Sequence, residues 1–306
     1  MHFTHHLDKE STIDVARISA IVFGKSAENY FPFLYDVFTK SVDKTPYQFM
    51  LPSEFEKISD LSQIQKIYWT ELVYRAHLAA VTSLLRHLKW IDGILLSAYF
   101  DNWYSFASNF RGLLESCGDS VDALKDVPGS FANNFSNIST AIEGKADKVL
   151  LAKNLENKLI HFSDAHRGRK GEKLPPEQRV KKTAEYLAQL QGDSEALKEL
   201  SECYGWLCQI THPAKHSVYF FFETSTIDDS EILTIDQERD ALWIADFCKR
   251  HQHMMYTLCQ TSFNHSLITL KIINRLPIPS LRNDDIEKID FSGLGLWRKL
   301  EPLLKN

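Results

Sequence analysis

Apolar side chains recur along most of this chain at alternating three- and four-residue steps, the period of an amphipathic α-helix. The longest such run, from Asp236 to Arg275, contains Ile244, Phe247, His251, Met254, Leu258, Thr261, His265, Ile268 and Ile272. A second stripe, within 101–126, contains Trp103, Phe106, Phe110, Leu113, Cys117, Val121 and Leu124. A third run starts near residue 60 and reaches 87 or beyond. The pattern therefore predicts three long helices.

Shorter stretches follow the same period, and most of the remaining chain is predicted to be helical. We expect these helices at 12–23, 28–42, 132–143, 147–164, 177–191 and 194–211. β-Branched and aromatic side chains gather only in 217–235, around a polar Asp-Asp-Ser turn, and predict one hairpin. A single hairpin cannot form a sheet-based core. The predicted fold class is therefore all-α, a multi-helix bundle with long antiparallel helices and one small β-hairpin insertion near 217–235.

The chain is predicted to form a single helical domain, residues 1–306. Its expected parts are an N-terminal helical segment, a core bundle and a C-terminal tail, at 1–52, 53–275 and 276–306. The core bundle carries a loop-like basic segment at 165–178 and the hairpin. With 44% hydrophobic and 25% charged residues, the composition is typical of a soluble globular protein.

Several classes of protein are excluded or disfavoured by what the sequence lacks. No window approaches the roughly 18 unbroken apolar residues of a membrane span. The five cysteines include no C-x-x-C pair, which favours reduced thiols and a cytoplasmic location. Walker, G-x-G-x-x-G, H-E-x-x-H, G-x-S-x-G and Glu-x-x-His motifs are absent, so no cofactor and no resident metal are predicted.

The basic segment is the first candidate for binding. Residues 166–182 hold seven Lys or Arg residues against two Glu, in a chain whose net charge is -5. Within it we single out Arg167, Arg169, Lys170 and Lys173 as RNA-binding residues, because cations on a Gly-containing loop can follow a phosphate backbone. The alternative is an ordinary solvated loop.

Two helical segments carry the candidate catalytic residues. In "NFRGLLESCGD", Arg111 and Glu115 stand four residues apart on one helix face, at the edge of the apolar stripe. In "YGWLCQITHP", Tyr204 precedes His212, which Pro213 forces out of the helical conformation. Arg111 is either held structurally by Glu115 or a neighbouring helix, or binds an anion. His212 either stabilises a helix end or takes part in catalysis or phosphate binding.

Two pairs of potential metal ligands have spacings that a metal site could use. His212 and His216 are four residues apart, but Pro213 breaks the helix face between them. His161 and Asp164 are three apart at an expected helix end, where a capping role is commoner. No metal site is predicted at either pair.

The Arg111/Glu115 helix and the later His212-Pro213 helix end resemble uncharacterised bacterial helical domains related to the HEPN superfamily. The resemblance rests on Arg111, Glu115, Tyr204, His212 and Pro213. Members are small helical bundles, common in toxin-antitoxin and phage-defence systems, and often ribonucleases. These ribonucleases usually carry Arg, then about four to six residues, then His on one helix. No arginine here has a histidine at that downstream spacing, so the resemblance implies a composite site built from two helices.

Two functions remain open from the sequence. The first is a cytoplasmic protein that engages RNA and cleaves it without a metal. The second is a non-catalytic scaffold or regulatory subunit that binds a protein partner. Apolar residues outside the core stripe of the Asp236–Arg275 helix further predict a homodimer through that helix. They are Leu242, Trp243, Met255, Phe263 and Leu270.

Overall fold

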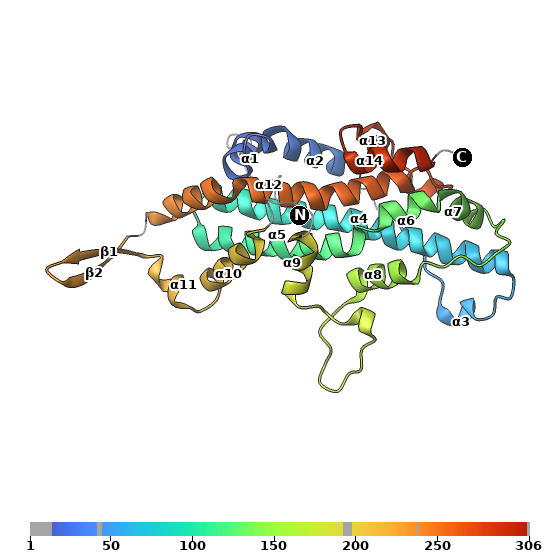
Figure 1. Cartoon of the computed structure of the whole chain (residues 1–306), viewed down its shortest axis with the longest axis horizontal. Helices are drawn as coiled ribbons and strands as arrows, with labels where there is room; N and C mark the ends of the chain where they lie inside the picture. The colour runs from blue at the N-terminus through green and yellow to red at the C-terminus, as the bar shows by residue number, and fades with distance from the viewer. Residues whose placement is uncertain (1–13, 42–44, 192–197, 237, 305–306) are drawn as a thin grey trace. The chain divides into compact units, whose positions relative to one another are not determined.

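The computed structural model describes residues 14–41, 45–191, 198–236 and 238–304, and most of them are helical (Figure 1). In chain order the α-helices are α1 (Val15–Phe23), α2 (Ala27–Ser41), α3 (Pro52–Phe55), α4 (Leu61–Tyr99), α5 (Trp103–Leu124), α6 (Val127–Asn133), α7 (Phe135–Ile142), α8 (Lys153–Asp164), α9 (Thr183–Gln191), α10 (Leu200–Thr211), α11 (Lys215–Tyr219), α12 (Arg239–Ile273), α13 (Asp284–Lys288) and α14 (Gly295–Leu300). Short 3-10 helices lie at η2 (Pro176–Gln178), η4 (Pro279–Leu281) and η5 (Glu301–Leu304). The predicted class, a helical bundle with one β-hairpin, is confirmed. No helix in the described part of the chain combines the length and apolarity that crossing a membrane requires.

The chain folds as two compact units. Unit 1 comprises Met1–Asp36, Leu88–Leu114 and Ser194–Leu258, and unit 2 comprises Val37–His87, Glu115–Asp193 and Cys259–Asn306. The long helices α4, α5 and α12 contribute residues to both units.

Unit 1 is built around an aromatic cluster on α5 and α12. The ring of Phe247 packs 5.7 Å from Phe106, 5.4 Å from Phe110 and 5.7 Å from Trp103, between ring centroids. Asn102 caps the start of α5, since its Oδ1 accepts a hydrogen bond of 2.9 Å from the backbone N–H of Ser105. All seven members of the predicted α5 stripe are fully buried, so the sequence located this core face correctly.

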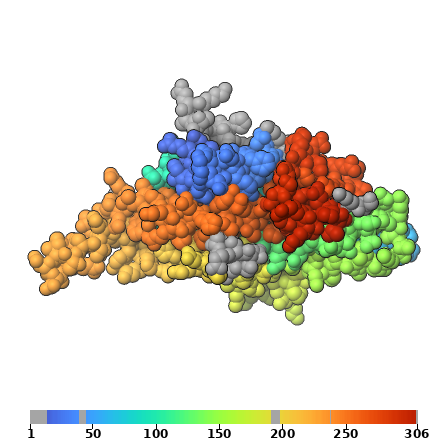
Figure 2. Space-filling model, turned by 45° about the horizontal axis from the view of Figure 1, so that its top comes forward, coloured from blue at the N-terminus to red at the C-terminus, as the bar shows by residue number. Residues whose placement is uncertain are grey.

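Unit 2 packs α6 and α7 against the C-terminal elements α14 and η5, which lie side by side in the space-filling view (Figure 2). Helix α6 starts directly after α5 ends because Pro128, near the first helical position, has no N–H to lose there. Trp297 of α14 is buried.

Two helices of unit 2 begin later than the sequence predicted. Helix α8 starts at Lys153 rather than 147, because polar side chains of α4 hold the preceding backbone in a non-helical course. Gln65 accepts a hydrogen bond of 2.8 Å from the Leu150 N–H, and the Tyr68 hydroxyl accepts one of 2.9 Å from the Ala152 N–H. Helix α9 starts at Thr183 rather than 177, after η2.

The hairpin consists of β1 (Phe222–Ile227) and β2 (Ser230–Ile235), paired antiparallel with Ile227 opposite Ser230. Asp228 and Asp229 form the two-residue turn, both with positive φ, +46° and +59°. Such turns match the twist of the flanking strands. The strand prediction began too early, because 215–219 form α11, whose start is closed by a 3.2 Å hydrogen bond from the Ala214 N–H to Ser217 Oγ. The hairpin extends beyond α11 as a narrow arm (Figures 1 and 2).

Helix α12 runs close to its predicted length, but its other faces are mostly covered within the chain. Met255 and Phe263 are fully buried and Leu270 is 4% exposed, while Trp243 is half-buried. Only Leu242, 67% exposed, remains an open apolar position among the five that suggested a second chain. The homodimer stays a prediction, and the width of the apolar surface on α12 no longer supports it.

Candidate functional site

Arg111 is the half-buried cation of α5 in unit 1. Its helix neighbours Phe110 and Leu114 are fully buried, so the guanidinium leaves the helix at the border of the apolar stripe. A cation at such a border loses part of its hydration and needs polar partners. These partners come from α10, about a hundred residues later in the chain.

Helix α10 ends at Thr211 because of the residues that follow. Pro213 disfavours a helical conformation at His212, whose φ and ψ of -107° and 157° are extended. The His212 N–H still donates to the Cys208 carbonyl oxygen at 3.1 Å, which closes the last turn. The imidazole therefore stands at the carbonyl end of α10, exposed to solvent.

The structure brings Arg111 and His212 into direct contact. Arg111 Nη1 donates to His212 Nε2 at 2.9 Å and to Thr211 Oγ1 at 3.1 Å. The Thr211 hydroxyl donates in turn to the Leu207 carbonyl oxygen at 3.0 Å. Because guanidinium N–H groups can only donate, His212 Nε2 must accept, and the ring is neutral with its proton on Nδ1. This geometry joins a neutral imidazole base to a permanent cation.

Tyr204 and Glu115 take different positions around this pair. The guanidinium carbon of Arg111 lies 5.7 Å from the centroid of the Tyr204 ring, within the range of a cation–π contact. Tyr204 therefore belongs to the same group of residues, on the face of α10 that Thr211 shares. Glu115 lies one helical turn beyond Arg111 on α5, half-buried, and belongs to unit 2.

The contact has a structural role as well as a possible chemical one. The carbonyl end of a helix carries partial negative charge, and a cation beside it stabilises the helix. Arg111 thus supports the end of α10 while holding His212 in one orientation. Exposure of His212 distinguishes it from a histidine that serves packing alone.

The basic loop lies in unit 2 and is anchored at its base. The His166 N–H donates to the Gln178 carbonyl oxygen at 3.1 Å, and Arg179 Nε donates to the Leu174 carbonyl oxygen at 2.8 Å. Between these anchors the predicted RNA-binding residues Arg167, Arg169, Lys170 and Lys173 are all exposed. Within the described chain none of these four side chains forms an ion pair. The loop projects from the end of α8 (Figure 1).

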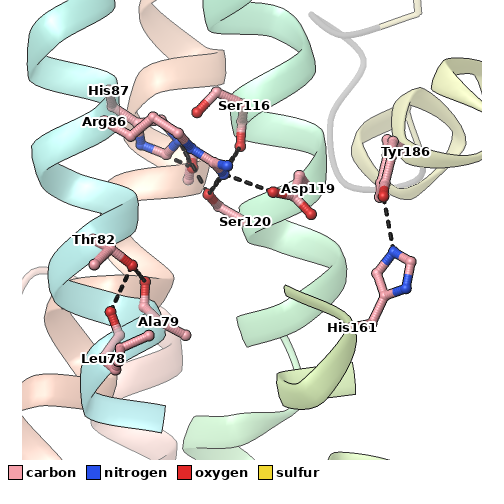
Figure 3. A network of polar contacts seen from close by, with 11 residues as sticks. Leu78, Ala79, Thr82, Arg86, His87, Ser116, Asp119, Ser120, His161 and Tyr186 are labelled. Atoms are coloured by element: carbon pink, nitrogen blue, oxygen red, sulfur yellow. Dashed lines mark hydrogen bonds and ion pairs between the residues drawn. The ribbon is translucent and has the colours of Figure 1, made fainter. Parts of the chain in front are cut away.

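Sequence reasoning did not find a polar network inside unit 2 (Figure 3). Arg86 of α4 donates to Asp119 Oδ2 at 2.7 Å, to the Ser116 carbonyl oxygen at 3.2 Å and to Ser120 Oγ at 3.2 Å, all on α5. Burial raises the pKa of the Asp119 carboxyl, and the Arg86 guanidinium opposes that rise. The available signal was a charged residue at an otherwise apolar helix position, as in "SLLRHLKW".

Histidines within this network are structural. His87 is fully buried, 3.2 Å from Ser120 Oγ, and burial lowers its pKa to about 3. His161 Nε2 lies 2.8 Å from the Tyr186 hydroxyl, which links α8 to α9, and burial raises the pKa of Tyr186 to about 12. Enclosed imidazoles of this kind contribute packing and hydrogen bonds rather than an accessible base.

The two residue pairs with metal-like spacing have other partners. His161 Nδ1 lies 3.0 Å from the Glu177 carbonyl oxygen, and Asp164 lies 3.7 Å from Arg75 Nη1. His212 is bonded to Arg111, and His216 lies on α11. Across the described residues, no group of three potential metal ligands gathers in one place.

Comparisons with known proteins place the chain near none of them. No protein-family model, curated protein or solved structure matches it. The residues themselves therefore carry the functional argument.

Proposed function

We propose that this chain is a cytoplasmic HEPN-like protein that engages RNA and cleaves it at the Arg111–His212 pair. The observation that carries the proposal is the 2.9 Å contact between Arg111 Nη1 and the exposed His212 Nε2. A composite site of this kind is what the resemblance to HEPN-like domains implies for this sequence. A toxin-antitoxin or phage-defence role follows from the resemblance alone.

The chemistry needs a base and a cation at one phosphate. His212 Nε2 takes the proton of a ribose 2′-hydroxyl, and the freed oxygen attacks the adjacent phosphorus. The bond from phosphorus to the 5′-oxygen breaks, and that oxygen takes a proton from water. The hydroxide that remains takes the proton from the His212 imidazolium and regenerates the base. Arg111 faces the charge that builds on the phosphoryl oxygens. The products are a 2′,3′-cyclic phosphate and a 5′-hydroxyl, and no step requires a metal.

Substrate binding would free the base. In the unbound chain Arg111 occupies the lone pair of His212 Nε2. A bound phosphate competes for the guanidinium, because charge-assisted hydrogen bonds to phosphate are stronger than those to a neutral imidazole. Tyr204 contacts the guanidinium through its ring, and an unpaired base can stack on that ring.

The basic loop also supports the proposal, because its exposed cations can bind RNA. Its four exposed cations, Arg167, Arg169, Lys170 and Lys173, form no ion pairs within the described chain. Free cations on an anchored loop neutralise phosphates and release counterions.

The proposal is tested by the ends of the RNA products. The purified chain is incubated with single-stranded RNA in excess EDTA, and the new ends are identified by mass spectrometry. We expect 2′,3′-cyclic phosphates and 5′-hydroxyls. Intact RNA, or products with 3′-hydroxyl ends, would refute the mechanism.

A non-catalytic partner-binding role is favoured by a different observation. The hairpin exposes Leu233 and Ile235 on one face, at 42% and 67%, and Ile227 and Ile232 on the other, at 55% and 38%. Apolar side chains gathered on an exposed hairpin are typical of a surface that binds another protein. Under this alternative a photo-crosslinking residue at Ile235 captures one protein reproducibly, whereas the same residue at exposed Lys25 does not, and RNA stays intact.

A further inference from the structure

Unit 1 contains a cavity that the proposed function does not use. It has a volume of about 540 Å³ and lies between α10, α11 and α12. Its walls include Glu199, Glu202, Trp206, Asp246 and His251. On α10 these wall residues stand on the side of the helix roughly opposite Tyr204 and Thr211, as helical spacing requires. The cavity is therefore separate from the Arg111–His212 pair.

The cavity carries excess negative charge. Asp246 is paired with Arg250, one turn along α12. Glu199 and Glu202 form no ion pair with any residue that the structure describes. Burial, and then the carboxylates of Glu199 and Glu202, raise the pKa of the neighbouring Cys203 thiol to about 12. Two uncompensated carboxylates thus face a space that has the size of a small-molecule site.

Aromatic rings form the apolar part of the wall. Trp206 and Phe247 stack with their planes 8° apart and their centroids 5.6 Å apart. A rigid stack of this kind gives a cation both an apolar contact and a π face. Behind it His251 Nδ1 is buried and has no hydrogen-bond partner within the described chain. Burial lowers the pKa of His251, and the carboxylates of Glu199, Asp246 and Glu202 oppose that shift.

We propose that this cavity binds an organic polycation, a small molecule with two or more ammonium groups. The carboxylates of Glu199, at the start of α10, and of Glu202 offer two anionic contacts, and the Trp206–Phe247 stack contacts the methylene chain between the ammonium groups. Asp246 also lines the cavity, but its charge is paired with Arg250. A single metal ion fits less well, because the cavity is far larger than an ion and no group of three potential ligands gathers within the described residues.

The test uses spermidine as the probe, titrated into the full chain by calorimetry at fixed ionic strength. We expect saturable binding of one spermidine per chain, weakened about tenfold in Glu199→Gln/Glu202→Gln, since each exposed ion pair changes affinity by up to about fivefold. The matched control is Glu223→Gln/Glu231→Gln, which removes two exposed carboxylates from the hairpin and should change affinity less than twofold. Circular dichroism checks that both variants keep the wild-type helix content.

Further measurements separate the outcomes. Trp206→Phe should remove most of the fluorescence change that spermidine causes, and Mg²⁺ at equal charge should not displace spermidine. Absence of saturable binding, or equal losses in the cavity and hairpin variants, would overturn the proposal. RNA cleavage is measured separately with Arg111 and His212 intact, so failure at the cavity leaves the proposed function standing.

Discussion

Arg111 Nη1 lies 2.9 Å from His212 Nε2, although the two residues are separated by 101 positions in the chain. The contact joins the middle of α5 to the end of α10 and fixes the proton of the neutral imidazole on Nδ1. Its energetic strength can be measured directly. In a double-mutant cycle of Arg111→Met and His212→Gln, we expect a coupling free energy of about 1 kcal/mol in urea unfolding at pH 8. Additive effects would show that the two side chains do not interact in solution.

The basic loop predicts a salt-dependent loss of RNA affinity. Replacing Arg167, Arg169 and Lys170 with Ala should weaken binding and lower the slope of log K against log salt by up to about 0.7 per lost phosphate contact on single strands. Fluorescence anisotropy at several salt concentrations measures both quantities.

A control for the loop variant tests whether any loss of charge suffices. Lys57, Lys145 and Lys288 are exposed cations outside the loop, 67%, 71% and 73% exposed in their side chains. Replacing all three with Ala removes the same charge. If the slope of log K against log salt falls equally for both triple variants, the loop contributes to RNA binding only through general surface charge.

Two buried histidines predict a loss of stability in acid. Burial lowers the pKa of His77 to about 4 and that of His87 to about 3, from 6.5. Because the unfolded chain binds protons more readily, the stabilisation is fully present above pH 6.5 and is lost as pH falls toward the folded-state values. Between pH 7.5 and 5, each histidine should lower the free energy of unfolding by on the order of 2 kcal/mol.

Urea unfolding of His77→Asn isolates one of these contributions. The variant should lose less stability than the wild type between pH 7.5 and 5. The exposed His253, replaced in the same way, should leave the wild-type pH dependence unchanged. If His77→Asn and wild type lose stability equally, His77 is accessible to protons in the folded state.

Gly118 is predicted to be required for packing of α9 on α5. A Cβ atom at Gly118 would lie 2.9 Å from Tyr186 Cβ and 3.1 Å from the Tyr186 backbone. Gly118→Ala should therefore cost about 1–3 kcal/mol in the free energy of unfolding. Gly129 in α6 faces open space, so Gly129→Ala should instead stabilise by about 0.5–1 kcal/mol. Equal changes in the free energy of unfolding for Gly118→Ala and Gly129→Ala would show that α9 can move to accept a methyl group at position 118.

Periodicity located most of the fold, since a 3.6-residue pattern follows directly from burial of one helix face. It placed the α5 stripe residue by residue. It failed where tertiary contacts decide local structure. Gln65 and Tyr68 hold the segment before α8 out of a helix, and Ser217 closes α11 where β-propensity favoured a strand.

The candidate site was only partly predictable for the same reason. Residue chemistry singled out Arg111 and His212, but their adjacency depends on how α10 packs against α5, which no local pattern encodes. Thr211, which also binds the guanidinium, carried no signal at all. Arg86 and Asp119 could have been found as charged residues within apolar stripes, whereas their pairing could not.

The most direct test of the central claim is the rate of RNA cleavage by His212→Ala beside His253→Ala, in EDTA. Both variants remove one exposed histidine, and only the first removes the proposed base. The account predicts a 10²- to 10⁴-fold fall in the rate for His212→Ala, a comparable fall for Arg111→Ala, and wild-type cleavage for His253→Ala. Cleavage by His212→Ala at the wild-type rate would contradict it.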